Sequence, residues 1–162
     1  MAVFDAFLKL HGIEGESNDK DFKGQIELDS FGLSAHQQGT QHHGGGGGAG
    51  RVEFSDLHCT KKYDRSSVQL MLACAMGQHF PEATITCRKA GGEQEPYLVL
   101  HLKDVLVSSY NMGGHGKGEL PIMDEISLQF GAILKEYKTQ TEKGTLGRPV
   151  KGGWNLKQHC KA

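Results

Sequence analysis

The stretch YLVLHLKDVLVSS, residues 97–109, carries the clearest fold signal in the sequence. Leucines at every second position alternate with Tyr97 and Val99, so apolar side chains occupy both faces of an extended chain. This pattern is typical of a strand in a sheet that is covered on both sides. The stretch therefore predicts a long strand with neither face open to water.

The preceding residues extend this strand into a hairpin. Ala83–Arg88 (ATITCR) alternates cleanly, with the odd-numbered residues expected inward and the even-numbered residues outward. Lys89–Glu95 (KAGGEQE) joins the two segments, and Gly91–Gly92 can adopt the positive φ values of a tight hairpin turn. The two segments are therefore predicted to pair as antiparallel strands.

Further stretches have strand character. They are Val3–Leu10, Gln25–Leu33, Arg51–Tyr63, Ile126–Leu134 and a short segment that holds Trp154 and Leu156. In Arg51–Tyr63 the apolar positions change parity, which predicts a β-bulge near Ser55–Asp56. Trp154 is expected to anchor its strand in the core.

One segment, from about Arg65 to Met76, is typical of an α-helix. Asp64 is the expected N-cap, and Gly77 is expected to end the helix in the left-handed conformation. The interior, VQLMLACAM, is apolar nearly all round, which predicts a helix buried on several sides. A small domain can hardly provide that burial, so other copies of the chain are candidates to cover the helix. We expect one mainly β domain over residues 1–162.

Charge and composition disfavour several classes of function. The 18 Lys and Arg residues nearly balance 19 Asp and Glu, so the sequence favours neither nucleic acid nor a membrane as a partner. No apolar run approaches a membrane-spanning length, and the first residues lack the features of a signal peptide. Cys59, Cys74 and Cys87 lie among apolar residues and form no C-x-x-C pair, which indicates buried, reduced thiols.

The motifs that resemble reactive sites are weak. Gly44–Gly50 (GGGGGAG) formally contains G-x-G-x-x-G, but a strand rather than a helix is expected to follow, which disfavours a nucleotide site. We expect Ala35–Gly50 to be a long loop that extends from the body. The nine histidines form neither H-x-x-x-H nor H-E-x-x-H. Ser66–Ser67 are expected at the helix start and Asp124–Glu125 in solvent, so no enzyme activity, metal or cofactor is predicted.

Several strings, in this order, resemble one known family. They are GGGGGAG at Gly44–Gly50, LMLAC at Leu70–Cys74, RKAGGE at Arg88–Glu93, YLVLHLKDVLVSS at Tyr97–Ser109 and PVKGGWN at Pro149–Asn155. The opening MAVFDAFLKLHGIEGES is also similar to the start of that family. The ordered set resembles the hemolysin-coregulated protein (Hcp) family, the tube proteins of bacterial type VI secretion systems.

The resemblance implies both a fold and a role. The implied fold is mainly β, a β-barrel of two packed sheets with one flanking α-helix, and six copies form a ring. Rings would assemble in the bacterial cytoplasm, stack into a tube inside a contractile sheath with a spike protein at the tip, and be secreted without a signal peptide. Small effector proteins would travel in the lumen.

Two sets of residues are predicted to act in assembly and cargo binding. The contact loop between subunits or rings comprises Gln41, His42, His43, Gly44, Gly45, Gly46, Gly47 and Gly48. His115 and Lys117 lie in a glycine-rich turn that is expected near the lumen, where it would tune the choice of cargo. Two alternatives stay open: a monomeric small β-barrel that binds carbohydrate or peptide, and a hydrolase with a cryptic His/Cys site.

Overall fold

The computed structural model describes residues 3–39, 49–90, 95–140 and 145–162, and within them the chain is mainly β. The strands are β1 (Phe4–Leu10), β2 (Ile26–Leu28), β3 (Ser30–Gly32), β4 (Ala35–Gly39), β5 (Ala49–Phe54), β6 (Leu57–Lys62), β7 (His79–Lys89), β8 (Pro96–Gly113), β9 (Met123–Gln129), β10 (Ala132–Gln140), β11 (Leu146–Asn155) and β12 (Cys160–Lys161). The one helix among these residues, α1, spans Ser66–Met76.

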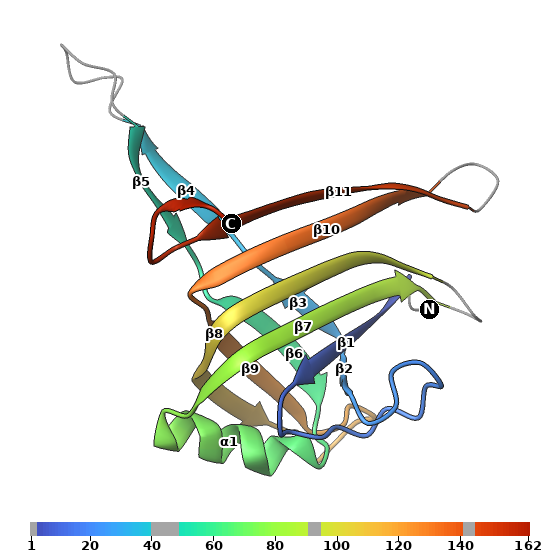
Figure 1. Cartoon of the computed structure of the whole chain (residues 1–162). Coiled ribbons are helices and arrows are strands. Elements are labelled where there is room, and N and C mark those ends of the chain that lie inside the picture. The colour runs from blue at the N-terminus through green and yellow to red at the C-terminus, as the bar shows by residue number, and fades with distance from the viewer. Residues whose placement is uncertain (1–2, 40–48, 91–94, 141–144) are drawn as a thin grey trace.

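Ten of these strands form one antiparallel sheet that folds over on itself (Figure 1). Its main path runs β12-β11-β10-β8-β7-β1-β2, and a branch runs from β8 through β9 and β6 to β3. The long strand β8 joins the two layers, because residues 98–103 pair with β10 whereas residues 106–113 pair with β9. Asp104 lies between these halves with a φ of 52°, a left-handed conformation that Asp tolerates better than most residues.

The predicted closed β-barrel is wrong, whereas the two packed layers and the flanking helix are confirmed. Among the described strands, the hydrogen-bonded path ends at β12 and β2, and the branch ends at β3. β2 and β3 have three residues each and only Asp29 between them, so the chain passes from one layer to the other there without pairing the two strands.

The core lies between the two layers and is closed at one end by α1 (Figure 1). The predicted hairpin is confirmed, since β7 pairs with β8, although turn residues 91–94 lie outside the described part of the chain. Ala83, Ile85 and Cys87 are buried as expected. Thr86 and Arg88 are buried too, contrary to expectation. They pair with β1 beside Phe7, whose ring stacks on Phe22 and covers this outer side.

Two predicted strands have different boundaries. No β-bulge occurs at Ser55–Asp56: the chain leaves the β4–β5 pair at Phe54 and enters the ten-stranded sheet at Leu57. The parity change therefore marks a passage between sheets. The run Ile126–Leu134 is two strands, β9 and β10, separated at Phe130–Gly131.

The predicted strands β8 and β11 are confirmed, and each differs from the prediction in one respect. Leu100 and Leu102 of β8 are buried, but Val99 and His101 on the other face are half-buried in the single chain. β11 is ten residues long rather than short. Trp154 is half-buried and packs against the core, as the sequence suggests.

Candidate self-assembly surfaces

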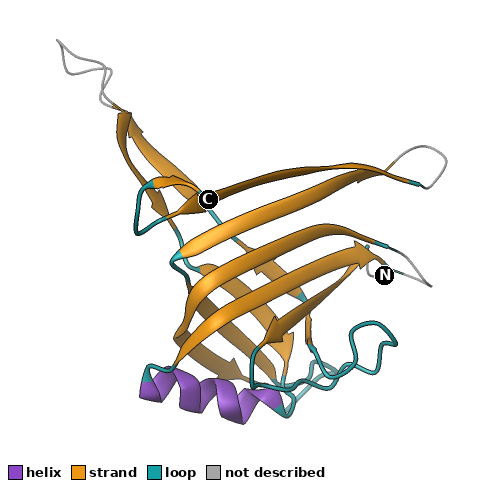
Figure 2. Cartoon of the chain, viewed as in Figure 1, coloured by secondary structure: helices purple, strands orange, loops and turns teal. Residues whose placement is uncertain are grey.

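The strands β4 and β5, together called the arm below, project from the body as a separate two-stranded sheet (Figure 2). β4 pairs with β5 from Ala35↔Phe54 to Gly39↔Ala49, and every residue of β4 is exposed. The described residues of the predicted loop, Ala35–Gly39 and 49–50, are strand rather than loop. Gly50 permits this pairing, because a Cβ there would lie 2.3 Å from the carbonyl oxygen of Gln38.

An isolated two-stranded hairpin is marginally stable in water, so the arm is expected to gain from a partner. Both of its outer strand edges carry backbone groups that no other described strand pairs with. The predicted contact residues Gln41, His42, His43 and Gly44–Gly48 fall between β4 and β5, outside the described residues. Their role stays a prediction.

A second surface is an apolar stripe along α1, formed by Val68, Met71, Leu72 and Met76. These side chains are 46–68% exposed and recur at the three- and four-residue spacing that places them on one helix face. Leu70 and Ala73, on another face, are buried in the core. The helix is thus buried on one side rather than several. An exposed apolar stripe of this kind is typical of a protein contact site.

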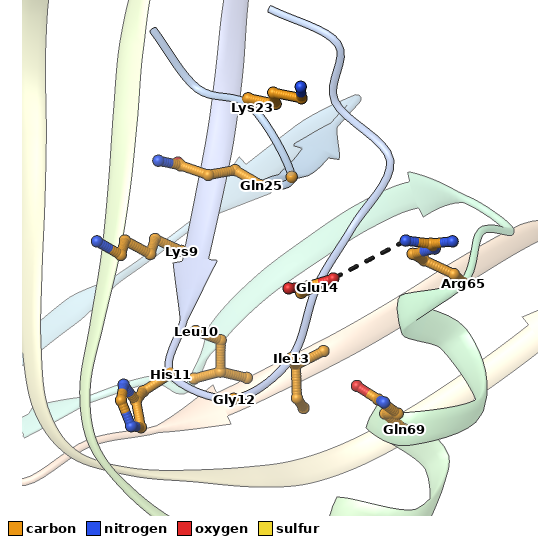
Figure 3. Close-up of a pocket in the computed structure, with 11 residues that line it drawn as sticks. Lys9, Leu10, His11, Gly12, Ile13, Glu14, Lys23, Gln25, Arg65 and Gln69 are labelled. Atoms are coloured by element: carbon orange, nitrogen blue, oxygen red, sulfur yellow. Dashed lines mark ion pairs between the residues drawn. The ribbon is translucent and has the colours of Figure 1, made fainter.

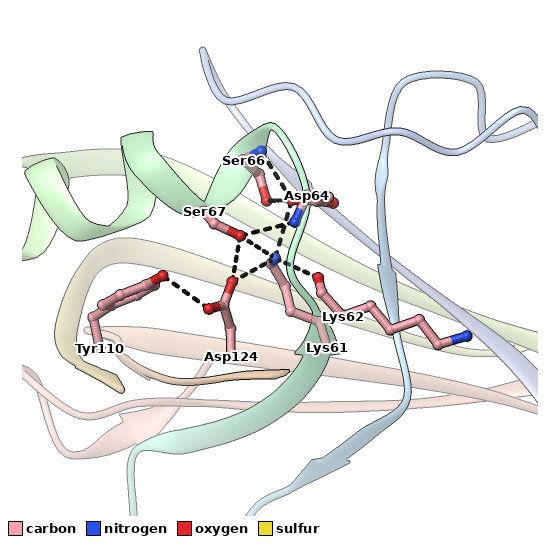
Figure 4. Close-up of polar contacts among 7 residues, drawn as sticks. All are labelled: Lys61, Lys62, Asp64, Ser66, Ser67, Tyr110 and Asp124. Atoms are coloured by element: carbon pink, nitrogen blue, oxygen red, sulfur yellow. Dashed lines mark hydrogen bonds and ion pairs between the residues drawn. The ribbon is translucent and has the colours of Figure 1, made fainter. Parts of the chain in front are cut away.

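The stripe is held in place by a buried charge network at the start of α1 (Figure 4). The Lys61 ammonium donates to Asp124 at 2.9 Å, and both side chains are fully buried. It also donates to Asp64 and Ser67, each at 3.0 Å. Because Ser66 and Ser67 both bond to these carboxylates, the network ties β6, β9 and the first turn of α1 together.

The network corrects two expectations. Asp124 was expected in solvent, yet it is buried and accepts hydrogen bonds from Lys61, Ser67 and Tyr110. Asp64 is expected to be the N-cap, but Arg65 holds that position; the Asp64 carboxylate, one residue earlier, accepts a hydrogen bond from the Ser66 backbone N–H at 2.8 Å. Burial, followed by the hydrogen bond to Asp124, raises the pKa of Tyr110, which therefore stays a donor.

The two ends of β6 separate the base of the arm from the turn that holds His115 and Lys117. The arm joins the body at Leu57, where β6 begins. The turn that holds His115 and Lys117 lies at the other end, because Lys62 pairs with Met123 and the Tyr63 N–H donates to Ile122. A six-residue strand spans about 20 Å. Both His115 and Lys117 are exposed, and their position near a lumen stays a prediction.

The described residues offer little reactive chemistry. No group of three or more His, Cys, Asp or Glu side chains among them is arranged to hold a metal ion. Burial raises the pKa of Cys59 to about 12 and that of Cys87 to about 11, so both thiols are protonated and poor nucleophiles. Within the same ranges, no helix is long and apolar enough to cross a membrane.

A two-layer β fold with a projecting arm and an apolar helix stripe defines a protein whose surfaces suit contact with other proteins. Comparison with known proteins identifies the family of this protein. Residues 7–137 match the family described as "Type VI secretion system effector, Hcp". The chain belongs to this Hcp family and is a structural subunit of the type VI secretion tube.

Individual relatives match over the full length. "Protein hcp1" of Pseudomonas aeruginosa is 44% identical over 164 residues, covering 100% of both chains. Hcp1 from Salmonella typhimurium has a solved structure that is similar, with a TM-score of 0.84 at 31% identity, covering 99% of this chain and 100% of that one. The solved "type six secretion system protein" matches with a TM-score of 0.93 at 30% identity, covering 98% and 99% of the two chains.

Proposed function

We propose that this chain works as a single domain over residues 1–162 and assembles into six-membered rings that stack into an exported tube. The exposed apolar stripe of α1 carries the proposal, since burying it against a neighbouring copy would remove unfavourable apolar exposure. Contacts between two different surfaces of identical subunits close into a ring when the rotation allows it, and repetition along the axis gives a tube.

The proposed partners follow from the family. The tube would assemble in the bacterial cytoplasm inside a contractile sheath, carry a spike protein at its tip, and leave the cell through the type VI system. Small effector proteins would bind in the lumen, where His115 and Lys117 would contribute polar and cationic contacts. Binding rather than catalysis is the proposed role, in keeping with the protonated thiols of Cys59 and Cys87.

Light scattering after gel filtration tests ring formation. Six times the chain mass of 17.7 kDa, about 106 kDa, is the expected species. A 17.7 kDa monomer at every concentration would contradict the ring and favour a monomeric binding module.

Stacking is tested at the arm. His42→Asp combined with His43→Asp places repelling charges in the predicted contact loop, so tubes should be lost from electron micrographs while rings of about 106 kDa persist. Tubes of unchanged length and number would show that these histidines do not contribute to stacking.

A further inference from the structure

Two oppositely charged depressions flank the 13–25 segment, and we propose that they bind each other between neighbouring copies in the ring. The basic pocket has a volume of about 620 Å³ and carries Lys9, His11, Lys23 and Arg65. The acidic groove has a volume of about 230 Å³ and carries Glu16, Glu27 and Asp29. The proposal rests on ring assembly and names the contact that closes it.

The basic pocket arises where three elements meet (Figure 3). Lys9 and His11 lie at the end of β1, Lys23 lies on the returning part of the segment, and Arg65 comes just before α1. The acid in this pocket is Glu14, which is 3.8 Å from Arg65 with both side chains largely exposed. Lys9, Lys23 and Arg65 outnumber this one carboxylate, so the pocket keeps a net positive charge.

The acidic groove follows from the strand alternation of β2. Ile26 and Leu28 point into the core, so Glu27 and Asp29 are left exposed at an edge of the sheet. Glu16 lies across from them on the segment. The groove is also lined by Lys62 and by Asp64, whose carboxylate accepts a hydrogen bond from Lys61.

The segment between the two depressions is fixed rather than free. Gly15 and Gly24 are joined by a backbone hydrogen bond of 2.8 Å, and Ser17 and Gly24 by another of the same length. Arg88 holds the segment from the sheet side: it pairs with Asp19 and lies 5.3 Å from the ring centroid of Phe22. Both charged surfaces therefore keep their shape without a partner, which lowers the entropic cost of binding.

Charge complementarity selects a second copy as the occupant. A ring needs two different surfaces on every subunit, and these two depressions have opposite charge and lie next to each other along one rigid segment, where Arg65 lines the pocket and Asp64 lines the groove. Pairing them across copies brings cations onto carboxylates, whereas like surfaces repel, so the contact also sets a single head-to-tail order around the ring.

Charge reversal tests the proposal. Lys9→Glu with Lys23→Glu reverses the pocket, and Glu27→Lys with Asp29→Lys reverses the groove. Each variant alone should shift the mass measured by light scattering from about 106 kDa towards 17.7 kDa. Mixing the two variants should restore the ring, because the subunits can then alternate, and a chain with all four substitutions should form rings by itself.

The control for the pocket variant is Lys89→Glu with Lys161→Glu, which changes the net charge by the same amount and sign at two exposed sites away from the pocket and should leave the ring intact. Circular dichroism checks that each variant is folded. Rings from both reversed variants, or no rescue by mixing or by the fourfold chain, would overturn the charged contact while leaving ring assembly in place. A monomeric parent chain would overturn both proposals.

Discussion

Lys61 and Asp124 are 63 residues apart in the chain, yet their charged groups lie 2.9 Å apart in the core. Taking two charges out of water is costly, and their attraction compensates only when other hydrogen bonds complete the site. Here Ser67, Asp64 and Tyr110 supply those bonds. The network therefore fixes where α1 begins.

Removing one partner should leave a buried, unpaired charge. Lys61→Met is expected to lower the free energy of unfolding by about 3–5 kcal/mol, measured by urea denaturation. The matched control is Lys157→Met, which breaks a 2.7 Å pair with Asp104 whose side chains are both at least 60% exposed. Because this pair is exposed to solvent, the loss of stability should be small. Equal losses would mean that the buried network does not stabilise the fold.

Asp19 should make stability depend on pH in acid. The hydrogen bond from Arg88 is the main cause that lowers the pKa of Asp19 below its usual value. This stabilisation is fully present above the unfolded pKa of about 3.9 and is lost as pH falls through the lower folded pKa. Asp19→Asn should therefore flatten the fall in unfolding midpoint below about pH 4.

Asp104 should also make stability fall in acid, since the hydrogen bond from Lys157 lowers its pKa. Asp104→Asn keeps a residue that tolerates the left-handed φ of 52° there. The unfolding midpoint of the double variant should fall less steeply with decreasing pH than that of either single variant. An unchanged slope in Asp19→Asn would refute the role of that carboxylate.

The cysteine thiols should differ in reactivity according to how deeply they are buried. With a pKa of about 12, Cys59 has a thiolate fraction of about 10⁻⁴ at pH 8, and Cys87 with a pKa of about 11 is also protonated. Cys160 is exposed and should react with a thiol reagent at once, and Cys160→Ser should remove that fast phase. Cys59 and Cys87 should react only as the chain unfolds; fast labelling of either would show that the core opens.

At the scale of elements, Gly77 ends α1 with a φ of 61°, and a Cβ there would meet no atom within 4 Å. The cost of Gly77→Ala is therefore conformational, about 1–2 kcal/mol in thermal or urea unfolding. Gly152→Ala in β11 is the control, because its space is equally open and its backbone has no positive φ. It should be neutral or stabilising; an equal loss at both positions would contradict the capping argument.

Local patterns predicted the elements whose signals are local. The segments Ala83–Arg88 and Tyr97–Ser109 predict strands and Gly77 predicts a helix end; these elements are confirmed, although Thr86 and Arg88 are buried against expectation. Where one strand runs into the next, periodicity continues across the break, so the sequence predicts a single strand where the structure has β9 and β10. The parity change before Leu57 looked like a bulge because sequence does not show which sheet a strand joins.

The candidate surfaces were predicted less completely than the fold. A helix that is apolar all round indicates partners, but only the fold shows that the side chains of Val68, Met71, Leu72 and Met76 stay exposed. The burial of Asp124 depends on Lys61 from a distant strand, which no local pattern reveals. The basic pocket and acidic groove likewise combine β1, β2 and the start of α1.

At the scale of the whole molecule, a substitution in the stripe on α1 should prevent assembly without preventing folding. Leu72 is 46% exposed, and Glu has a helix propensity close to that of Leu, so Leu72→Glu should change the free energy of unfolding of the isolated chain by no more than about 0.5 kcal/mol. In a ring, the same carboxylate would be buried against apolar atoms without a partner, which is strongly unfavourable.

Leu72→Glu is therefore expected to give folded monomers of 17.7 kDa where the parent chain gives about 106 kDa. Val3→Glu introduces the same charge at an 83% exposed site outside the stripe and should leave the ring mass unchanged. If both variants form rings, α1 does not contact a neighbouring copy, and the stripe must instead face a different protein. If both are monomeric, added charge alone opposes assembly, which would point to electrostatic contacts such as the basic pocket as the dominant ones.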